Sequence, residues 1–324
     1  MATGLYHEDQ TVCLALSIDG RLLASGSIDT TILLYDIDLT TNFIRPLSKF
    51  DGHNKSLSNL AIHPLRHHIA SCDHNIMLIW DTTTHNIVWR GPAVCKPNYN
   101  PAGTQLCFMN GNELVVLDAT SVNYSIVLHV SISATTLCGL QFSFDGSKFL
   151  GVSAVDQALT VWDAVDGSVL QVLSVPPKEI DVSENNMFML LSPLVDTNIS
   201  CCCFHPLNSQ SVFSGSPAAI REWDLSSGKI IWEETEPKMN VLCKAISSNG
   251  RLMAVGSLHY GAVVVWSLVG NRTSLFSLEQ GKYANCSSSV YSVFFSKDSS
   301  RLVVASNEEV IRVWDAVSID TSII

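Results

Sequence analysis

The sequence predicts an all-β fold, a seven-bladed β-propeller with four antiparallel strands in each blade. Two observations lead to this prediction. A hairpin-forming unit recurs seven times along the 324 residues, and its apolar runs are too short, and too rich in β-branched and aromatic residues, for helices. One hairpin cannot bury its own apolar face, so the copies are expected to pack against one another.

The unit is most complete at 143–163, which reads SFDGSKFLGVSAVDQALTVWD. A polar turn at Asp145-Gly146 precedes an apolar strand at 149–152. A tight turn at 154–157 leads to a second apolar strand at 158–162, which ends at Asp163. Asp-Gly pairs are typical of hairpin turns because both residues tolerate a positive φ angle.

Six further copies of the unit follow the same plan. They lie at 17–36, 63–81, 100–118, 205–224, 247–267 and 296–315, and their closing residues are 45, 37, 45, 61, 43 and 48 residues apart. An inner strand is expected before most copies and an outer strand after the closing pair, as at 169–173 and 229–232. We therefore expect one domain over 1–324, with repeat cores near 11–36, 57–81, 94–118, 137–163, 199–224, 241–267 and 290–315.

Three segments depart from the pattern. The third copy is short, because it closes on Leu117-Asp118 around an Asn-Gly-Asn turn at 110–112, and the sixth closes on Trp266-Ser267. The connection at 174–198 is long, with an acidic stretch before an apolar one, and loops of this length are often functional. It is either a docking element or a loop packed against the body. Either terminus could supply the outer strand of the last blade.

Composition limits the functional classes. With 47% hydrophobic and 15% charged residues, the chain suits stacked sheets that are buried on both faces. The net charge of −11 and the lack of a Lys/Arg-rich run argue against direct nucleic-acid binding. The apolar stretch at 187–195 is too short to cross a bilayer, and the first ten residues resemble no secretory signal. A reducing compartment is expected, without membrane contact.

The cysteines and histidines are expected to be structural. Most of the ten cysteines fall within predicted strands, where they behave as small apolar groups. In the run Cys201-Cys202-Cys203, strand alternation sends the middle side chain to the opposite face of the sheet. The histidines at 63, 67, 68 and 74 and Cys72 suggest metal ligands, but His68 and His74 lie at opposite ends of one predicted strand. We therefore expect no metal and no cofactor.

The period, the closing Trp-Asp pairs and Gly52-His53 together resemble the WD-repeat family over essentially the whole chain. The family pattern implies a hydrogen-bonded set of Ser or Thr, His, Asp and Trp within a blade, with a structural role. This resemblance assigns His53, Ser71, Asp73 and Trp80 to the set of the second repeat, and Ser153, Asp156 and Trp162 to that of the fourth, where Ser133 replaces the histidine. A catalytic Ser-His-Asp alternative is weaker, since no activated serine motif is present, and we expect no enzymatic activity.

The same resemblance implies where partners bind. In WD propellers, the loops between blades and those between the two central strands share the narrower face. The corresponding residues are Asn54, His74, Asn75, Asn110, Asn112, Gln157, Met187, Phe188, Leu190, His259, Tyr260, Glu308 and Glu309. Because this set combines apolar anchors with an acidic excess, we expect a protein partner that offers a basic or extended peptide segment.

Two short stretches narrow the resemblance. GPAVC at 91–95 and GLQFSFDGSK at 139–148 are similar to the small nuclear WD subunit of COMPASS-type histone methyltransferase complexes, which also serves a PNUTS–phosphatase complex in transcription termination. This implies a nuclear, non-catalytic scaffold, monomeric within a hetero-complex. A cullin-type ubiquitin-ligase receptor is the first alternative, disfavoured because no Trp-Asp pair is followed by x-Arg. Another WD scaffold in the cytoplasm is the second.

Overall fold

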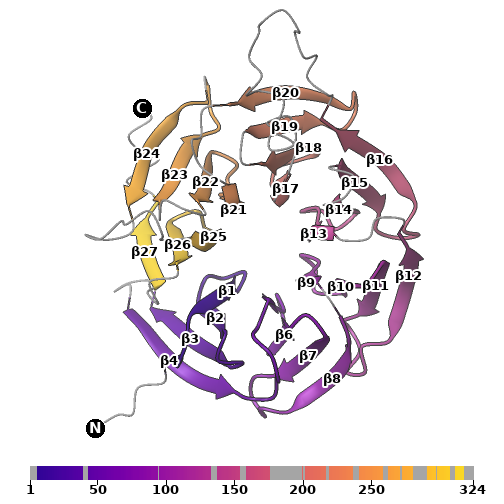
Figure 1. Ribbon diagram of the computed structural model, residues 1–324, viewed down its shortest axis with the longest axis vertical. Coiled ribbons are helices and arrows are strands. Elements are labelled where there is room, and N and C mark those ends of the chain that lie inside the picture. Colours follow the sequence, from indigo (N-terminus) through magenta and orange to yellow (C-terminus); the bar gives the residue numbers. More distant parts are fainter. Residues whose placement is uncertain are drawn as a thin grey trace, which may run out of the picture.

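Among its described residues, the computed structural model contains 27 β-strands in seven antiparallel sheets and no helix. It describes residues 6–38, 43–93, 95–132, 137–153, 158–175, 199, 201–216, 219–235, 241–257, 262–270, 272–279, 290–296, 298–306 and 311–316. The sheets follow one another around a central axis as the blades of a propeller (Figure 1). The predicted all-β, seven-bladed fold is confirmed.

Each blade is a meander in which consecutive strands pair, running from the axis outward. Blades 1 to 4 comprise β1 (Thr11–Leu16), β2 (Leu22–Ser27), β3 (Ile32–Asp38), β4 (Phe43–Phe50); β5 (Asn59–Ile62), β6 (His68–Cys72), β7 (Ile76–Asp81), β8 (Ile87–Pro92); β9 (Cys95–Tyr99), β10 (Gln105–Asn110), β11 (Glu113–Asp118), β12 (Ile126–Ser131); and β13 (Leu137–Phe142), β14 (Lys148–Ser153), β15 (Ala158–Asp163), β16 (Val169–Ser174).

Blades 5 to 7 repeat this plan. They comprise β17 (Cys201–His205), β18 (Asn208–Gly215), β19 (Ile220–Asp224), β20 (Lys229–Glu234); β21 (Val241–Ile246), β22 (Leu252–Ser257), β23 (Ala262–Ser267), β24 (Ser274–Glu279); and β25 (Val290–Phe295), β26 (Arg301–Ser306), β27 (Ile311–Asp315). Three strands of blade 7 fall within the described part of the chain, and both termini, from which a fourth strand was expected, lie outside it.

The polar turns between the first and second strands form as the sequence predicts. In blade 4, the Ser143 hydroxyl contacts Asp145 at 2.6 Å and accepts a hydrogen bond from the Lys148 amide at 2.9 Å. Gly146 has a φ of 71°, which glycine adopts without a steric penalty. Equivalent turns begin at Ser17, Ser247 and Ser296, so one local chemistry starts most of the hairpins.

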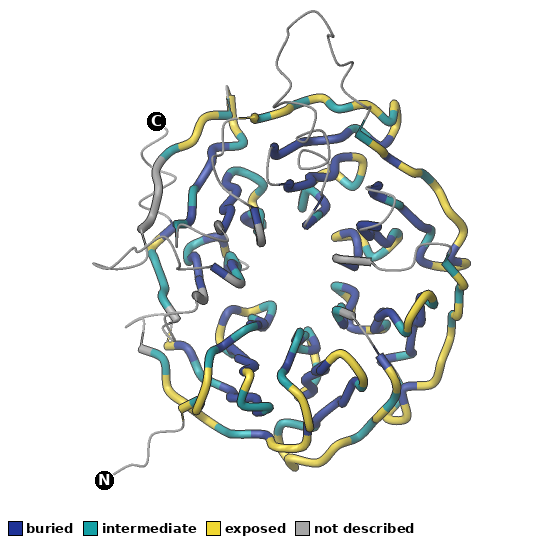
Figure 2. The backbone as a smooth tube through the Cα atoms, in the orientation of Figure 1, coloured by how far each residue is buried: buried dark blue, intermediate teal, exposed yellow. Residues whose placement is uncertain are grey.

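The core lies between the blades. The cluster between blades 1 and 2 contains Ile32 and Leu57 of one side and Ile69, Leu78 and Trp80 of the other, all buried. The predicted alternation of the cysteine run is confirmed, because Cys201 and Cys203 pack in the cluster facing blade 6, whereas Cys202 packs in the one facing blade 4. Burial falls toward the rim, where the outermost strands are largely exposed (Figure 2).

Antiparallel connection places the turns on two opposite faces. The upper face carries the turns between second and third strands, at 27–31, 73–75 and 110–112, and the connections between blades, such as 51–58. The lower face carries the remaining turns, at 63–67, 81–86, 143–147 and 163–168. Nothing in the described part of the chain is a helix able to span a membrane.

Candidate functional site

The four residues predicted for the second repeat lie together beneath the upper face. His53 Nδ1 lies 3.0 Å from Asp73 Oδ2, and its Nε2 lies 2.7 Å from Ser71 Oγ. Trp80 Nε1 donates to the same Ser71 oxygen at 2.9 Å. All four residues are buried. The set therefore joins the inter-blade connection at 51–58 to the second and third strands of its own blade, β6 and β7, and to the turn between them.

Burial and hydrogen bonding fix the protonation states of His53 and Asp73 in this set. Burial lowers the pKa of His53, although the nearby Asp73 carboxylate opposes the shift. Burial alone would raise the pKa of Asp73, but hydrogen bonds from the Ile76 amide, His53 and the Asn75 amide outweigh it and lower the pKa. A neutral His53 that donates from Nδ1 to an ionised Asp73 satisfies both groups. Ser71 is fully buried, so its hydroxyl is inaccessible to a substrate.

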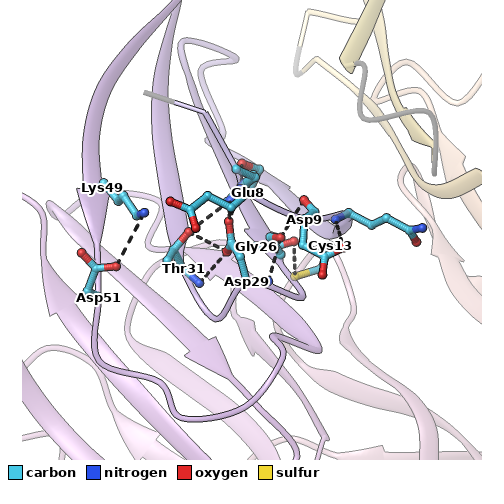
Figure 3. A network of polar contacts seen from close by, with 12 residues as sticks. Glu8, Asp9, Cys13, Gly26, Asp29, Thr31, Lys49 and Asp51 are labelled. Atoms are coloured by element: carbon cyan, nitrogen blue, oxygen red, sulfur yellow. Dashed lines mark hydrogen bonds and ion pairs between the residues drawn. The ribbon is translucent and has the colours of Figure 1, made fainter. Parts of the chain in front are cut away.

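Blade 1 contains a matching set that the sequence analysis did not predict. His7 Nε2 lies 2.7 Å from Ser25 Oγ, and its Nδ1 lies 3.1 Å from both Asp29 Oδ2 and Thr31 Oγ1. Figure 3 shows Asp29 and Thr31 in this network, with the backbone of Glu8 donating to Asp29 at 2.8 Å. The available signal was the spacing, because 18 residues separate histidine from serine in both blades.

The set assigned to the fourth repeat requires a correction. Phe149 pairs with Trp162 across the hairpin, as Ile69 pairs with Trp80 in blade 2, so the position equivalent to Ser71 is Gly151. Ser153 lies two residues further along the strand, because the hairpin of blade 4 is two residues longer than that of blade 2. Gly151 has no hydroxyl to accept a hydrogen bond from Trp162. Asp156 and Ser133 lie outside the described residues.

The upper face of blades 1 to 3 exposes several of the predicted partner-binding residues. Asn54, His74, Asn75 and Asn112 are exposed, and Asn110 is half-buried. The Asn75 and Asn112 carbonyls are fixed by the amides of Ala93 and Ile132, at 3.1 and 2.7 Å. The other predicted residues, Gln157, Met187, Phe188, Leu190, His259, Tyr260, Glu308 and Glu309, lie outside the described part of the chain, and their role stays a prediction.

Three carboxylates on this face were not among the predicted residues. Glu8 and Asp9 are exposed beside the blade 1 network, and the Asp51 side chain is 71% exposed in the connection to blade 2. Figure 3 shows Glu8 and Asp9 near Asp29, with Asp51 to the side beyond Lys49. Lys49 lies 4.0 Å from Asp51, a weak exposed ion pair. Lys55 is also exposed in this connection, so the upper face of blades 1 and 2 carries three exposed carboxylates against the two lysines Lys49 and Lys55.

A buried charged cluster between blades 5 and 6 was also missed. Glu222 accepts from Ser211 Oγ at 2.5 Å and pairs with Arg272 Nη1, while Arg272 stacks over the Trp232 ring at 5.6 Å. On the opposite face of β19, Arg221 is equally buried and pairs through Nε with Glu233 at 2.7 Å. The signal was Glu222 itself, which occupies a strand position that is Leu, Ile or Val in the other repeats.

Two of the clustered histidines, His63 and His68, pack against tyrosines of blade 3. The His63 ring packs at a tilt against Tyr99 with ring centroids 4.7 Å apart, and His68 Nδ1 lies 2.7 Å from the Tyr124 hydroxyl. Among the described residues, no three His, Cys, Asp or Glu side chains are arranged to hold a metal ion. These histidines instead fill the interface between blades 2 and 3.

Comparison with known proteins supports the repeat assignment. The family model described as "WD domain, G-beta repeat" matches residues 3–36, 44–81 and 278–315. Pre-mRNA-processing factor 19 of Caenorhabditis elegans is 26% identical over 182 residues, 52% of this chain and 34% of that protein. Pre-mRNA-processing factor 17 of Saccharomyces cerevisiae is 26% identical over 194 residues, 56% of this chain and 39% of that protein.

A third relative matches a shorter part of the chain at a higher sequence identity than the two processing factors. The intraflagellar transport protein 122 homolog of Mus musculus is 31% identical over 74 residues, which is 23% of this chain and 6% of that protein. The chain thus spans between a third and two fifths of the two processing factors, and far less of the transport protein. Taken with the seven sheets, these matches show that the chain contains WD40 repeats and folds as a seven-bladed β-propeller.

Proposed function

We propose that this propeller is a non-catalytic scaffold whose upper face binds a basic, extended segment of a larger protein. The acidic upper face of blades 1 and 2 carries the proposal. Glu8, Asp9 and Asp51 are exposed there, above hydrogen-bonded sets that hold their loops in place. A rigid loop loses less conformational entropy on binding than a mobile one, and an acidic rim speeds capture of a basic partner.

The proposed setting is a nuclear complex that acts on chromatin or transcription. Two relatives are pre-mRNA-processing factors, which supports a nuclear location. The resemblance at 91–95 and 139–148 supports a histone methyltransferase or phosphatase–termination complex more specifically. In such an assembly the chain is one monomeric propeller that joins other subunits. A fluorescent fusion confined to the cytoplasm would contradict this setting.

Affinity purification of the tagged full chain tests the scaffold role and its face together. The test variant combines Glu8→Gln, Asp9→Asn and Asp51→Asn. Its matched control, Asp118→Asn, Asp166→Asn and Asp224→Asn, removes the same charge from turns of the lower face and keeps their hydrogen-bond acceptors. Equal melting temperatures would show that both variants fold.

We expect mass spectrometry to recover specific partners with the wild-type chain and the control, and to lose a major partner with the test variant. Methyltransferase-complex or phosphatase-complex subunits among the partners would support the finer assignment, whereas ligase subunits would favour the cullin-type alternative. If both variants retain every partner, the upper face of blades 1 and 2 is not the binding surface.

A further inference from the structure

The seven strands nearest the axis have an unusual composition. The strands β1, β5, β9, β13, β17, β21 and β25 line the centre of the ring (Figure 1). They carry no Asp or Glu, although the chain has a net charge of −11. Their only Lys or Arg residues are Lys96 and Lys244, and they hold seven of the ten cysteines. The centre is therefore cationic and rich in thiols inside an acidic protein.

The Lys244 ammonium has no counter-charge among the residues that the structure describes. Its Nζ atom is buried and has no hydrogen-bond partner in the described part of the chain. Its electrostatic neighbours are the thiols of Cys202 and Cys203 on the adjacent inner strand β17. A buried ammonium without a partner is unfavourable, since it has given up its hydration and gained nothing in return. An anion bound here would supply the missing partner.

Lys96 approaches the same region from the other side of the ring. It belongs to blade 3, yet it acts electrostatically on Cys13, Cys202 and Cys243, which belong to blades 1, 5 and 6. Burial raises the pKa of these thiols, to about 12 for Cys13 and Cys202, and Lys96 only partly opposes the rise. The thiols are protonated at neutral pH, so they do not neutralise the two cations.

The residues of this region are partly exposed, although the Lys244 Nζ atom itself is buried. Lys96, Cys202, Cys243 and Lys244 all retain partial exposure. Neighbouring blades cover the faces of their sheets and the second strands cover their outer edges, so this exposure lies toward the axis. A Cβ added at Gly139 of blade 4 would stand 3.6 Å from the Cys202 sulfur, an ordinary van der Waals contact.

We propose that the axis of this propeller binds a phosphate-class oxyanion between Lys96 and Lys244. Two ammonium groups from different blades match a doubly charged, tetrahedral anion, which offers oxygens in several directions. A carboxylate has fewer oxygens and half the charge. A metal cation is disfavoured, because the lysines repel it and thiols bind metals only when deprotonated. This site is independent of the protein-binding upper face.

Binding of inorganic phosphate to the full chain tests the proposal, by calorimetry at constant ionic strength with chloride as the replaced anion. The test variant is Lys244→Met, which keeps the length of the side chain and removes its charge. The control is Lys229→Met on β20, an exposed residue at the rim, with the same change in net charge. Lys96→Met provides a second test variant on another blade.

We expect the wild-type chain and the control to bind phosphate with the same affinity. Either test variant should bind at least about tenfold more weakly, because it loses one charge-assisted hydrogen bond to the anion. Without phosphate, Lys244→Met should melt at a higher temperature than wild type, because it removes an unpaired buried charge. With phosphate, the wild type should gain stability and the variant little.

Absence of phosphate binding by the wild-type chain would overturn the proposal. So would equal binding by the wild type and both test variants. An Asp-rich peptide that binds through Lys244 without competition from phosphate would also overturn it, since the axis would then recognise a carboxylate from a protein partner.

Discussion

Replacing His53 by alanine tests the hydrogen-bonded set that fixes the upper face of blade 2. The change removes the donor at 3.0 Å from Asp73 and the partner at 2.7 Å from Ser71. Asp73 keeps hydrogen bonds from the Asn75 and Ile76 amides, and Ser71 can still turn to the Leu78 carbonyl at 3.3 Å. The loss is therefore one charge-assisted hydrogen bond in a buried site, worth about 1–3 kcal/mol of unfolding free energy.

The assay is guanidinium unfolding followed by tryptophan fluorescence and circular dichroism. His67→Ala is the control, since His67 is exposed on the same blade and should change stability by less than about 0.5 kcal/mol. Trp80→Ala provides the upper reference, about 3–5 kcal/mol, because it opens a cavity beside Phe50. If His53→Ala unfolds like His67→Ala, the set contributes nothing and the reasoning is refuted.

Three further predictions concern other parts of the ring. Burial lowers the pKa of His63 to about 4, so the unfolded chain takes up a proton at a higher pH than the folded chain. The free energy of unfolding should therefore fall by up to about 1.4 kcal/mol per pH unit as the pH drops from about 6.5 toward 4. His63→Asn, which keeps a turn acceptor like that of Asn100, should flatten this slope, and an unchanged slope would exclude His63 as its source. Gly26→Ala places a Cβ 2.7 Å from Cys13 Sγ and 3.0 Å from Leu57 and should lower the free energy of unfolding by about 1–3 kcal/mol. Gly139→Ala, whose Cβ has its nearest contact at 3.6 Å, should be tolerated. Equal melting temperatures of the two variants would contradict this prediction. Arg272→Met leaves the buried Glu222 carboxylate without its partner and should lower the free energy of unfolding by about 3 kcal/mol or more. Adding Glu222→Met should restore most of this loss. If the effects of the two changes are additive in a double-mutant cycle measured by denaturant unfolding, the pair is not coupled.

The fold could be predicted because its determinants are local and repeated. Turns such as Ser143–Gly146 set each hairpin through side-chain to backbone hydrogen bonds and a positive φ at glycine. Since seven copies carry this chemistry, a weak copy such as the third is identified by its neighbours. The hydrogen-bonded set of blade 2 could likewise be assigned from the family pattern.

The remaining features depend on register and packing, which spacing alone does not reveal. Nine residues separate Ser153 from Trp162 and Ser71 from Trp80, yet the longer hairpin of blade 4 moves Ser153 out of the equivalent position. The pairing of Glu222 with Arg272 joins residues 50 apart in the chain. Lys96 of blade 3 and Lys244 of blade 6 both act electrostatically on the Cys202 thiol of blade 5, which requires the closed ring.

The central claim, that partners bind the upper face, is tested most directly by photo-crosslinking. A photoreactive amino acid replaces Asn54, exposed on the upper face, or Val165, which is 85% exposed on the lower face. The full chain is then irradiated in nuclear extract and its adducts are identified by mass spectrometry. We expect a discrete adduct with a basic segment from position 54 and none from position 165. A discrete adduct from position 165 alone would contradict it.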